Sequence, residues 1–407
     1  MPAPKPSPTK EVASSERLPR TVIIVGLVSM LNDFASEMVV PLIPLLLATV
    51  LAAGPAALGA IEGGADAVSN LVKLWAGRNS DMLGRRRKPF VVLGYLVSNI
   101  FRPLIGTSAS WITVLGIRIS DRIGKGLRTA PRDAMIADAA VNTGAGRAFG
   151  FARALDHAGA VLGALTAAAV VHWGTHNLEA VIALSAVPGS LAVALIALGI
   201  KEPPAVEQRA ATPAPLRWHA LHKDARGFLV AVALFSLGRI PETFLLLRGH
   251  ELGLGTVPLL ILWAALHAFK SLLSNLAGKM ADRYGRHPLI LAGWGLYVAA
   301  LVWLALSDSP ALLVAGAFIL AAHFGLSEGA ERALIRDVAS AEERGTAFGW
   351  YHMLTGLAAI LAGLTLGWLW VLYAAKTAFL ASALLGGVGT MVFWWNSRSR
   401  IGRTNAS

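Results

Sequence analysis

Twelve apolar segments, each about as long as a membrane-spanning helix, follow one another along this chain. A helix needs about 20 mainly apolar residues to cross the hydrocarbon core of a bilayer. Charged residues make up 15% of the sequence and hydrophobic residues 55%, as expected where lipid is the solvent. We therefore expect an all-α integral membrane protein. The expected spans lie near residues 21–50, 55–77, 88–107, 110–138, 145–173, 178–200, 226–249, 255–278, 288–307, 311–337, 344–372 and 375–396.

Basic residues gather in alternate connecting segments, and the net charge of the chain is +12. Because Lys and Arg are retained on the cytoplasmic side, these segments and both termini are predicted to be cytoplasmic. Residues 1–20 and 398–407 are then cytoplasmic tails, and we expect a bacterial inner (plasma) membrane protein. The first tail is not expected to be a cleavable signal peptide, because no short apolar core with a cleavage site follows it. The topology explains the positive charge, so no nucleic-acid partner is expected.

The chain contains an internal repeat. The segment from Gly77 through Asp81 and Gly84 to Arg86 recurs 201 residues later, and residues 148–150 recur 199 residues later. Two similar shifts that bracket half of the chain predict two six-helix halves in the same orientation, related by a pseudo-symmetry axis along the membrane normal. The halves are expected at residues 21–200 and 226–397, and the Pro-rich segment 201–225 is the linker between them.

The repeated segment resembles the signature loop of the major facilitator superfamily, G-x-x-x-D-x-x-G-R-[RK], and lies between spans two and three as in that family. The resemblance implies the major facilitator fold, a small-molecule substrate and transport by alternating access, in the manner of bacterial drug or metabolite exporters. In this loop Gly77 and Gly84 would allow a tight turn and close approach, and Asp81 would act as a gate latch. The basic residues are favoured to set topology alone. The expected gating residues are Gly77, Asp81, Gly84, Arg85, Asp282 and Arg286.

Span four carries an unusual density of charge. Arg122 and Gly126 resemble the R-x-x-Q-G motif that the same family associates with proton coupling, although Lys125 replaces the usual Gln. Arg118 and Asp121 share most of the same helix face. Charges at membrane depth cost several kcal/mol unless they pair or meet water, which favours a functional role. The alternative is a static ion pair that locks spans four and one together.

Carboxylates recur at helical spacing in the first two spans. Asp33 and Glu37 lie one turn apart in span one, and Glu62 and Asp66 begin a polar face of span two that continues to Asn70 and Lys73. A carboxylate that exchanges water for an Arg as a cavity opens and closes would release or take up a proton. We expect Asp33 first, then Glu37 and Asp66, in this role. Alternatively, Glu62 and Asp66 pair with Lys73 or Arg122 for structure alone.

Further polar groups occur in spans five, seven and eight. Gly159 and Gly163 predict tight helix packing in span five, and residues 238–242 predict a broken helix in span seven. The first half has more acidic groups and the second more basic ones, which would suit a zwitterionic or partly charged organic solute. The additional cavity or coupling residues expected here are Arg153, Asp156, His157, Arg239, Glu242, His267 and Lys270.

These features favour a proton-coupled secondary transporter that exports a small organic solute. We expect protons, the substrate and membrane lipid as its partners, a monomeric state, and neither enzymatic activity nor a cofactor; no nucleotide-binding loop is present. One alternative is export of a divalent metal such as nickel or cobalt, with ligands drawn from the carboxylates and four histidines. Another is a non-transporting receptor on a transporter scaffold. The histidines are His157, His267, His323 and His352.

Overall fold

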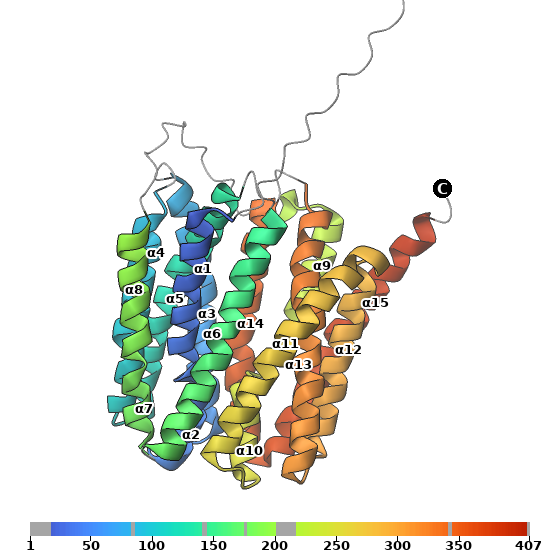
Figure 1. Ribbon diagram of the computed structural model, residues 1–407. Helices are drawn as coiled ribbons and strands as arrows, with labels where there is room; N and C mark the ends of the chain where they lie inside the picture. The colour runs from blue at the N-terminus through green and yellow to red at the C-terminus, as the bar shows by residue number, and fades with distance from the viewer. Residues whose placement is uncertain are drawn as a thin grey trace, which may run out of the picture.

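The computed structural model describes residues 18–82, 86–140, 145–174, 177–200, 217–340 and 344–404, and every regular element within them is a helix. The helices run side by side along one common direction (Figure 1). The elements of the first half are α1 (Arg20–Glu37), η1 (Val40–Leu42), α2 (Ile43–Thr49), α3 (Pro55–Met82), α4 (Lys88–Phe101), η2 (Arg102–Thr107), α5 (Trp111–Ala139), α6 (Ala145–Trp173), α7 (Leu178–Leu184) and α8 (Ala186–Gly199).

The second half begins after a short turn, η3, and repeats the same up-and-down course. Its elements are η3 (Trp218–Ala220), α9 (Lys223–Leu237), α10 (Thr243–Glu251), α11 (Thr256–Tyr284), α12 (Arg286–Ala305), α13 (Pro310–Val338), α14 (Arg344–Tyr373) and α15 (Ala375–Thr404). Short helices that continue one another, such as α9 and α10, form single crossings. The described residues thus make twelve crossings, which confirms the predicted fold class.

Nine of these crossings, as far as the structure describes them, are long and apolar enough to span a membrane by composition alone. The other three are α3, α5 and the interrupted pair α9–α10. Each of the three carries several of the charged residues that the sequence marks as functional. A charged helix is tolerated in a membrane when it faces the interior of the bundle or water. The three exceptions therefore mark where a polar interior must lie.

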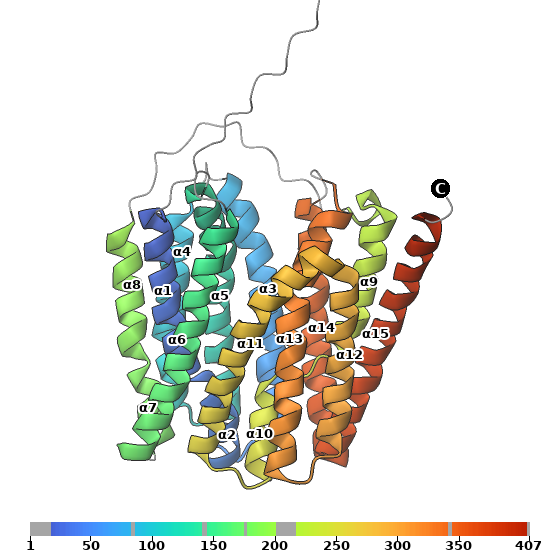
Figure 2. The same cartoon turned by 45° about the vertical axis from the view of Figure 1, so that its right-hand side comes forward.

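The two halves meet along two seams, where α3 packs against α14 and α6 packs against α11 (Figures 1 and 2). Glycines let the backbones of α3 and α14 touch. A Cβ built on Gly59 would lie 2.0 Å from the carbonyl oxygen of Gly363, and one on Gly63 would lie 2.5 Å from that of Ala359. Such a seam has no room for even a methyl group.

Within the first half, glycines also join α6 to α1. A Cβ on Gly159 would lie 2.2 Å from the carbonyl oxygen of Met30, and one on Gly163 would lie 2.3 Å from that of Phe34. The tight packing predicted from the Gly159–Gly163 spacing is confirmed. This contact brings the polar residues near the end of α1 close to those of α6.

The start of α1 and the end of α15 lie at the same end of the helices, which we call the terminal face (Figures 1 and 2). The helices α2, α7 and α10 lie toward the other end, the opposite face. Near that face Gly367 of α14 approaches the start of α3. A Cβ built on Gly367 would lie 2.8 Å from the carbonyl oxygen of Pro55. The α3–α14 seam is thus closed toward the opposite face.

Candidate substrate cavity

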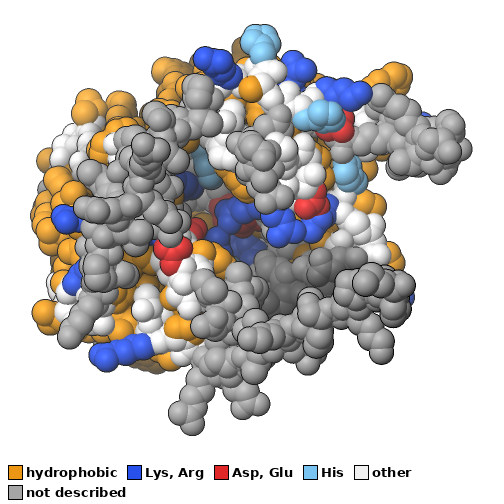
Figure 3. Space-filling model, turned by 90° about the horizontal axis from the view of Figure 1, so that it is seen from above, with side chains coloured by type: hydrophobic (Ala, Val, Ile, Leu, Met, Phe, Trp, Pro, Cys, Tyr) orange, Lys and Arg blue, Asp and Glu red, His pale blue; other side chains and the backbone are white. Residues whose placement is uncertain are grey.

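A cavity of about 530 Å³ lies between the two halves, and its wall is unusually polar for the interior of a membrane protein. Seen from the terminal face, the molecule is hollowed at its centre, and Lys, Arg, Asp and Glu side chains gather in the hollow (Figure 3). The titratable residues that line it are Asp33, Glu37, Glu62, Asp66, Lys73, Arg102, Asp121, Arg122, Lys125, Arg128, Arg153, Asp156, His157, Arg239, Glu242, His267, Lys270, Glu328, Arg332, Tyr351 and His352.

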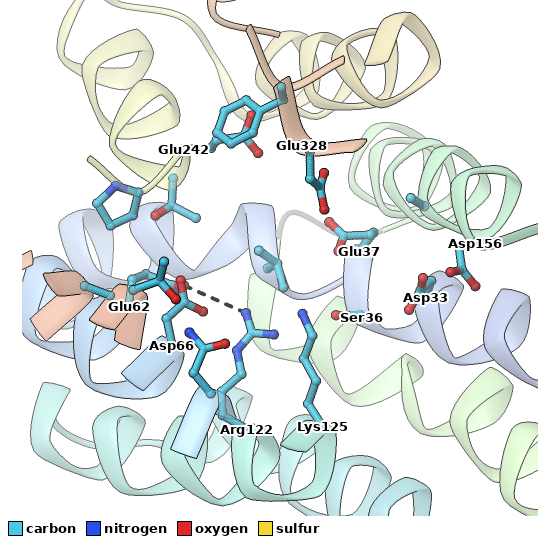
Figure 4. Close-up of a pocket in the computed structure, with 18 of the residues that line it drawn as sticks. Asp33, Ser36, Glu37, Glu62, Asp66, Arg122, Lys125, Asp156, Glu242 and Glu328 are labelled. Atoms are coloured by element: carbon cyan, nitrogen blue, oxygen red, sulfur yellow. Dashed lines mark ion pairs between the residues drawn. The ribbon is translucent and has the colours of Figure 1, made fainter. Parts of the chain in front are cut away.

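The cavity brings together all but one of the fourteen coupling or cavity residues that the sequence indicates. The exception is Arg118, whose side chain is fully buried in the first half, behind the wall. Figure 4 shows carboxylates of both halves, such as Glu62 and Glu242, around the same space as Arg122 and Lys125. The placement is a fact of the structure, whereas the roles of these residues stay predictions.

Arg118 is the centre of a buried ion network that joins α3, α5 and η2. It contacts Glu62 at 3.3 Å and Asp121 at 3.1 Å, and Asp121 in turn contacts Arg102 at 3.1 Å. Arg122 lies 3.9 Å from the second oxygen of Glu62. Buried charges of this kind are stable only when each has a partner, so the network fixes three crossings relative to one another. The alternative considered for span four, an ion pair with span one, is not what the network forms: its partners are spans two and three.

The polar face predicted for α3 lines the cavity along its whole length, from Glu62 through Asp66 and Asn70 to Lys73. Its members differ in their partners. Glu62 belongs to the buried network, and the Lys73 ammonium donates to Asn70 at 3.4 Å. Asp66 is exposed to the cavity and has no cation within 4 Å among the described residues. The structural role considered for this face therefore fits Glu62 and leaves Asp66 available to a solute or proton.

A second acidic pair lies where α1 meets α6. The carboxylates of Asp33 and Asp156 lie close together in Figure 4 and interact electrostatically. Asp156 has Arg132 and Arg153 at 3.8 Å, whereas Asp33 accepts only one weak hydrogen bond, 3.2 Å from Asn32, among the described residues. The pair places two carboxylates beside one another at the cavity wall, and the part of Asp33 in coupling stays a prediction.

Glu37 joins the two halves. The indole Nε1 of Trp263 on α11 donates to its carboxylate at 2.8 Å, and His267 Nε2 lies 3.8 Å from the same oxygen. Glu37 is the last residue of α1, where the crossing breaks before η1. Any motion that separates α1 from α11 must therefore break a hydrogen bond to a carboxylate.

In the second half, the break predicted at residues 238–242 is present between α9 and α10. Tyr297 holds it: its hydroxyl donates to the carbonyl of Gly238 at 2.7 Å and accepts from the N–H of Ile240 at 2.8 Å. The hydroxyl of Ser382 also donates to the Gly238 carbonyl. Irregular backbone inside a membrane requires such partners, and it occurs where it lines a cavity.

The two charged residues of this break, Arg239 and Glu242, have different partners. Glu242 pairs with Lys270 of α11 at 2.9 Å. Arg239 has no carboxylate within 4 Å in the described part of the chain, and its guanidinium lies over the rings of Phe324 and Phe235 at 5.4 and 5.8 Å. The broken helix thus presents one neutralised and one unneutralised charge to the cavity.

The gating segment differs from its prediction in one respect. Gly77 does not form a turn, because α3 continues through it to Met82; its role is close approach, since a Cβ there would lie 3.2 Å from that of Ala130 on α5. Gly84 and Arg85 lie outside the described residues. Asp81 and Asp282 belong to α3 and α11, and the structure describes their backbone but not their side chains.

An ion pair between helix ends recurs in both halves at the terminal face. Arg87, before α4, pairs with Asp138 near the end of α5. Arg286, at the start of α12, pairs with Asp337 near the end of α13. The two pairs are related by the 199-residue repeat. Sequence reasoning placed Arg286 in a gate but matched it to Arg85, and so missed the pairing with the fourth and tenth crossings.

Several polar contacts were not predicted. Arg102 becomes a partner of Asp121 only because η2 packs beside α5. Glu331 is buried in the second half and accepts from Trp294 at 2.7 Å and from Tyr351 at 3.0 Å. A lone Arg or Glu inside an apolar segment was the available signal for both, because such residues need partners at membrane depth.

The metal-export alternative gains no support from the described residues, in which no three His, Asp or Glu side chains are arranged to hold a metal ion. His157, His267 and His352 line the cavity on three different crossings. His323 is buried outside it, and its Nδ1 lies 2.9 Å from the carbonyl of Gly293.

Comparison with known proteins agrees with this architecture. The sequence profile of the Major Facilitator Superfamily matches residues 25–269 and 245–407. The chain belongs to the major facilitator superfamily. An uncharacterised transporter of this superfamily type from Methanocaldococcus jannaschii is 30% identical over 381 residues, which are 92% of this chain and 94% of the relative.

Solved transporter structures share the fold at low sequence identity. The crystal structure of the nucleoside transporter NupG has a TM-score of 0.73 and 14% identity, covering 92% of this chain and 98% of NupG. A transporter of the POT family in complex with 5-aminolevulinic acid has a TM-score of 0.76 and 12% identity, covering 92% and 95%. The protein is thus a multi-pass membrane transporter of the secondary type.

Proposed function

We propose that this superfamily member couples proton movement to the export of a small, charged organic solute. The observation that carries the proposal is the cavity wall, where unpaired carboxylates of α1 and α3 face the same space as cations of both halves. A cavity of about 530 Å³ lies within the range of small-molecule sites. Its polar wall favours a charged solute over an apolar one.

The terminal face is cytoplasmic in this proposal, because the basic connecting segments lie there. The structure then corresponds to an inward-open state, with the α3–α14 glycine seam closing the outer end. Alternating access requires that seam to open while the terminal face closes. Pairs such as Arg87–Asp138 stay within one half and can move with it as a unit.

Asp33 is the first candidate for the proton-carrying group, and Glu37 is the second. Asp33 lines the cavity and has no cation within 4 Å among the described residues, so a proton there would break no ion pair. Glu37 would change its surroundings in every cycle, because its partners Trp263 and His267 belong to the other half. Export follows if a proton enters from outside as solute leaves.

The test uses protein reconstituted in liposomes that contain a pH-sensitive dye. A panel of amino acids, organic acids, nucleosides and amines is scanned for solutes that move protons, and the same solutes are tested for exchange without a pH gradient. Asp33→Asn should abolish proton-coupled movement and retain exchange. Asp308→Asn is the matched control, because Asp308 is an exposed residue outside the cavity, and it should behave as wild type.

Full proton coupling in both Asp33→Asn and Glu37→Gln would overturn the proposed coupling sites. A solute that shows net movement at the same rate with and without a pH gradient, and that moves no protons, would instead identify transport that is not coupled to protons. That result would leave the cavity as the transport site but remove protons from the mechanism.

A further inference from the structure

Three buried polar atoms without a hydrogen-bond partner cluster at the break between α9 and α10. They are Ser236 Oγ, Arg239 Nε and Thr243 Oγ1, none of which has a partner among the described residues. Ser236 and Thr243 are each 3% exposed, and all three residues line the cavity. A buried donor without a partner costs about 1–3 kcal/mol, so three of them at one place indicate a site for a ligand.

The charge at this cluster is positive. Arg239 lies over aromatic ring faces and has no carboxylate within 4 Å in the described ranges. Two carboxylates, Glu331 and Glu328, act on Arg239 from beyond ion-pair distance, and neither forms an ion pair with its guanidinium among the described residues. Glu331 accepts from Trp294 and Tyr351, and Glu328 pairs with Arg332 at 2.7 Å.

The remaining neighbours reinforce that charge. The break is followed by the N-terminus of α10, which carries a positive partial charge. Glu242 stands at that N-terminus, yet its carboxylate makes no capping hydrogen bond and instead contacts Lys270 at 2.9 and 3.1 Å. The N-cap carboxylate of Glu242 therefore leaves the first backbone N–H groups of α10 without a side-chain hydrogen bond.

The backbone on both sides of Arg239 is also held in place. Arg239 stands between Gly238 and Ile240, and the hydroxyl of Tyr297 holds the backbone of both. A guanidinium on an anchored backbone, packed between Phe235 and Phe324, loses little freedom when it binds an anion. Its planar donor geometry matches the two oxygens of a carboxylate or phosphate.

We propose that Ser236, Arg239 and Thr243 form an oxyanion subsite that binds the carboxylate or phosphate group of the transported solute. The inference rests on the proposed function and narrows it: the solute is an organic acid or a phosphate ester. Asp33 and Asp66, on the first half, are placed to repel that group and so orient the solute with its anionic end toward α9 and α10.

The test is thermal unfolding of the purified full-length protein in detergent, with acetate, inorganic phosphate or chloride titrated at constant ionic strength. Wild type should be stabilised saturably by acetate or phosphate beyond the effect of chloride. Arg239→Gln should remove this excess, whereas Ser236→Ala and Thr243→Val should each weaken the apparent affinity about tenfold. Arg217→Gln, an exposed residue outside the cavity, should respond as wild type does.

A response to acetate alone identifies a carboxylate subsite, and a response to phosphate alone identifies a phosphate subsite. Equal responses in wild type and Arg239→Gln, or no excess over chloride in wild type, overturn the proposal. Should Arg239→Gln fail to fold, the Ser236→Ala, Thr243→Val double variant gives the same decision. Because the unfolding assay uses no pH gradient, the anion response does not depend on proton coupling: loss of the response in wild type with proton-coupled transport intact refutes the subsite alone, and an intact response without proton-coupled transport refutes the proposed function alone.

Discussion

Replacement of Gly59 by Ala should shift the transporter away from the conformation described above. The added methyl group would lie 2.0 Å from the carbonyl oxygen of Gly363, well inside contact distance, so α3 and α14 must separate. Overpacking of this kind costs about 1–3 kcal/mol. Since about 1.4 kcal/mol is a tenfold change in an equilibrium, the ratio of this state to the outward-open state should fall roughly 5- to 150-fold.

The chain has no cysteine, so a single introduced cysteine reports on accessibility without background. Val40 lines the cavity directly before α2, on the side of the opposite face, and Val40→Cys provides the reporter. A membrane-impermeant maleimide added at the opposite face should label this cysteine faster when Gly59→Ala is also present.

Gly387→Ala is the matched control, because a Cβ at that helical glycine meets nothing within 4 Å. It supplies the same gain in helix propensity without the clash. Equal labelling rates for the Gly59→Ala and Gly387→Ala proteins would refute the claim that the glycine seam closes the cavity toward the opposite face.

Three shorter predictions concern the buried network, the helix break and the contact between halves. Arg118→Gln should lower the free energy of unfolding by about 3–5 kcal/mol, because it strands Glu62; an unchanged melting temperature in detergent would contradict the network's importance. Tyr297→Phe should cost about 1–3 kcal/mol by freeing the α9–α10 backbone, while Tyr284→Phe, at an exposed position, should melt as wild type does. Glu37→Gln keeps an acceptor for the indole but cannot titrate, so transport measured against external pH should lose steepness; an unchanged profile would exclude Glu37 from coupling.

The crossings could be predicted from the sequence because the length of an apolar run and the position of Lys and Arg are local properties. The span expected at 88–107 coincides with α4 and η2 together. The helix ends could be predicted less well, because polar residues can extend a helix past the bilayer. The helices α3 and α11 continue to Met82 and Tyr284, beyond the expected limits of 77 and 278.

Partner choice could not be predicted in the same way, because it depends on which helices become neighbours. Helical spacing placed Glu62 and Asp66 on one face, and both line the cavity. Their different roles appear only once α5 is docked beside α3, where Arg118 reaches Glu62 and leaves Asp66 without a cation within 4 Å in the described chain. The partners of Glu331 depend in the same way on the packing of α12 and α14.

The interiors of the two halves are built from different chemistry on a shared plan. Ion pairs around Arg118 fasten the centre of the first, whereas stacked rings fasten the second, with Phe235 and Trp294 parallel at 4.1 Å. A buried ion-pair network is destabilised when one member loses its charge, whereas stacked aromatic rings do not depend on a charge. Substitutions that remove a charge should therefore be more disruptive around Arg118 than around the stack of Phe235 and Trp294.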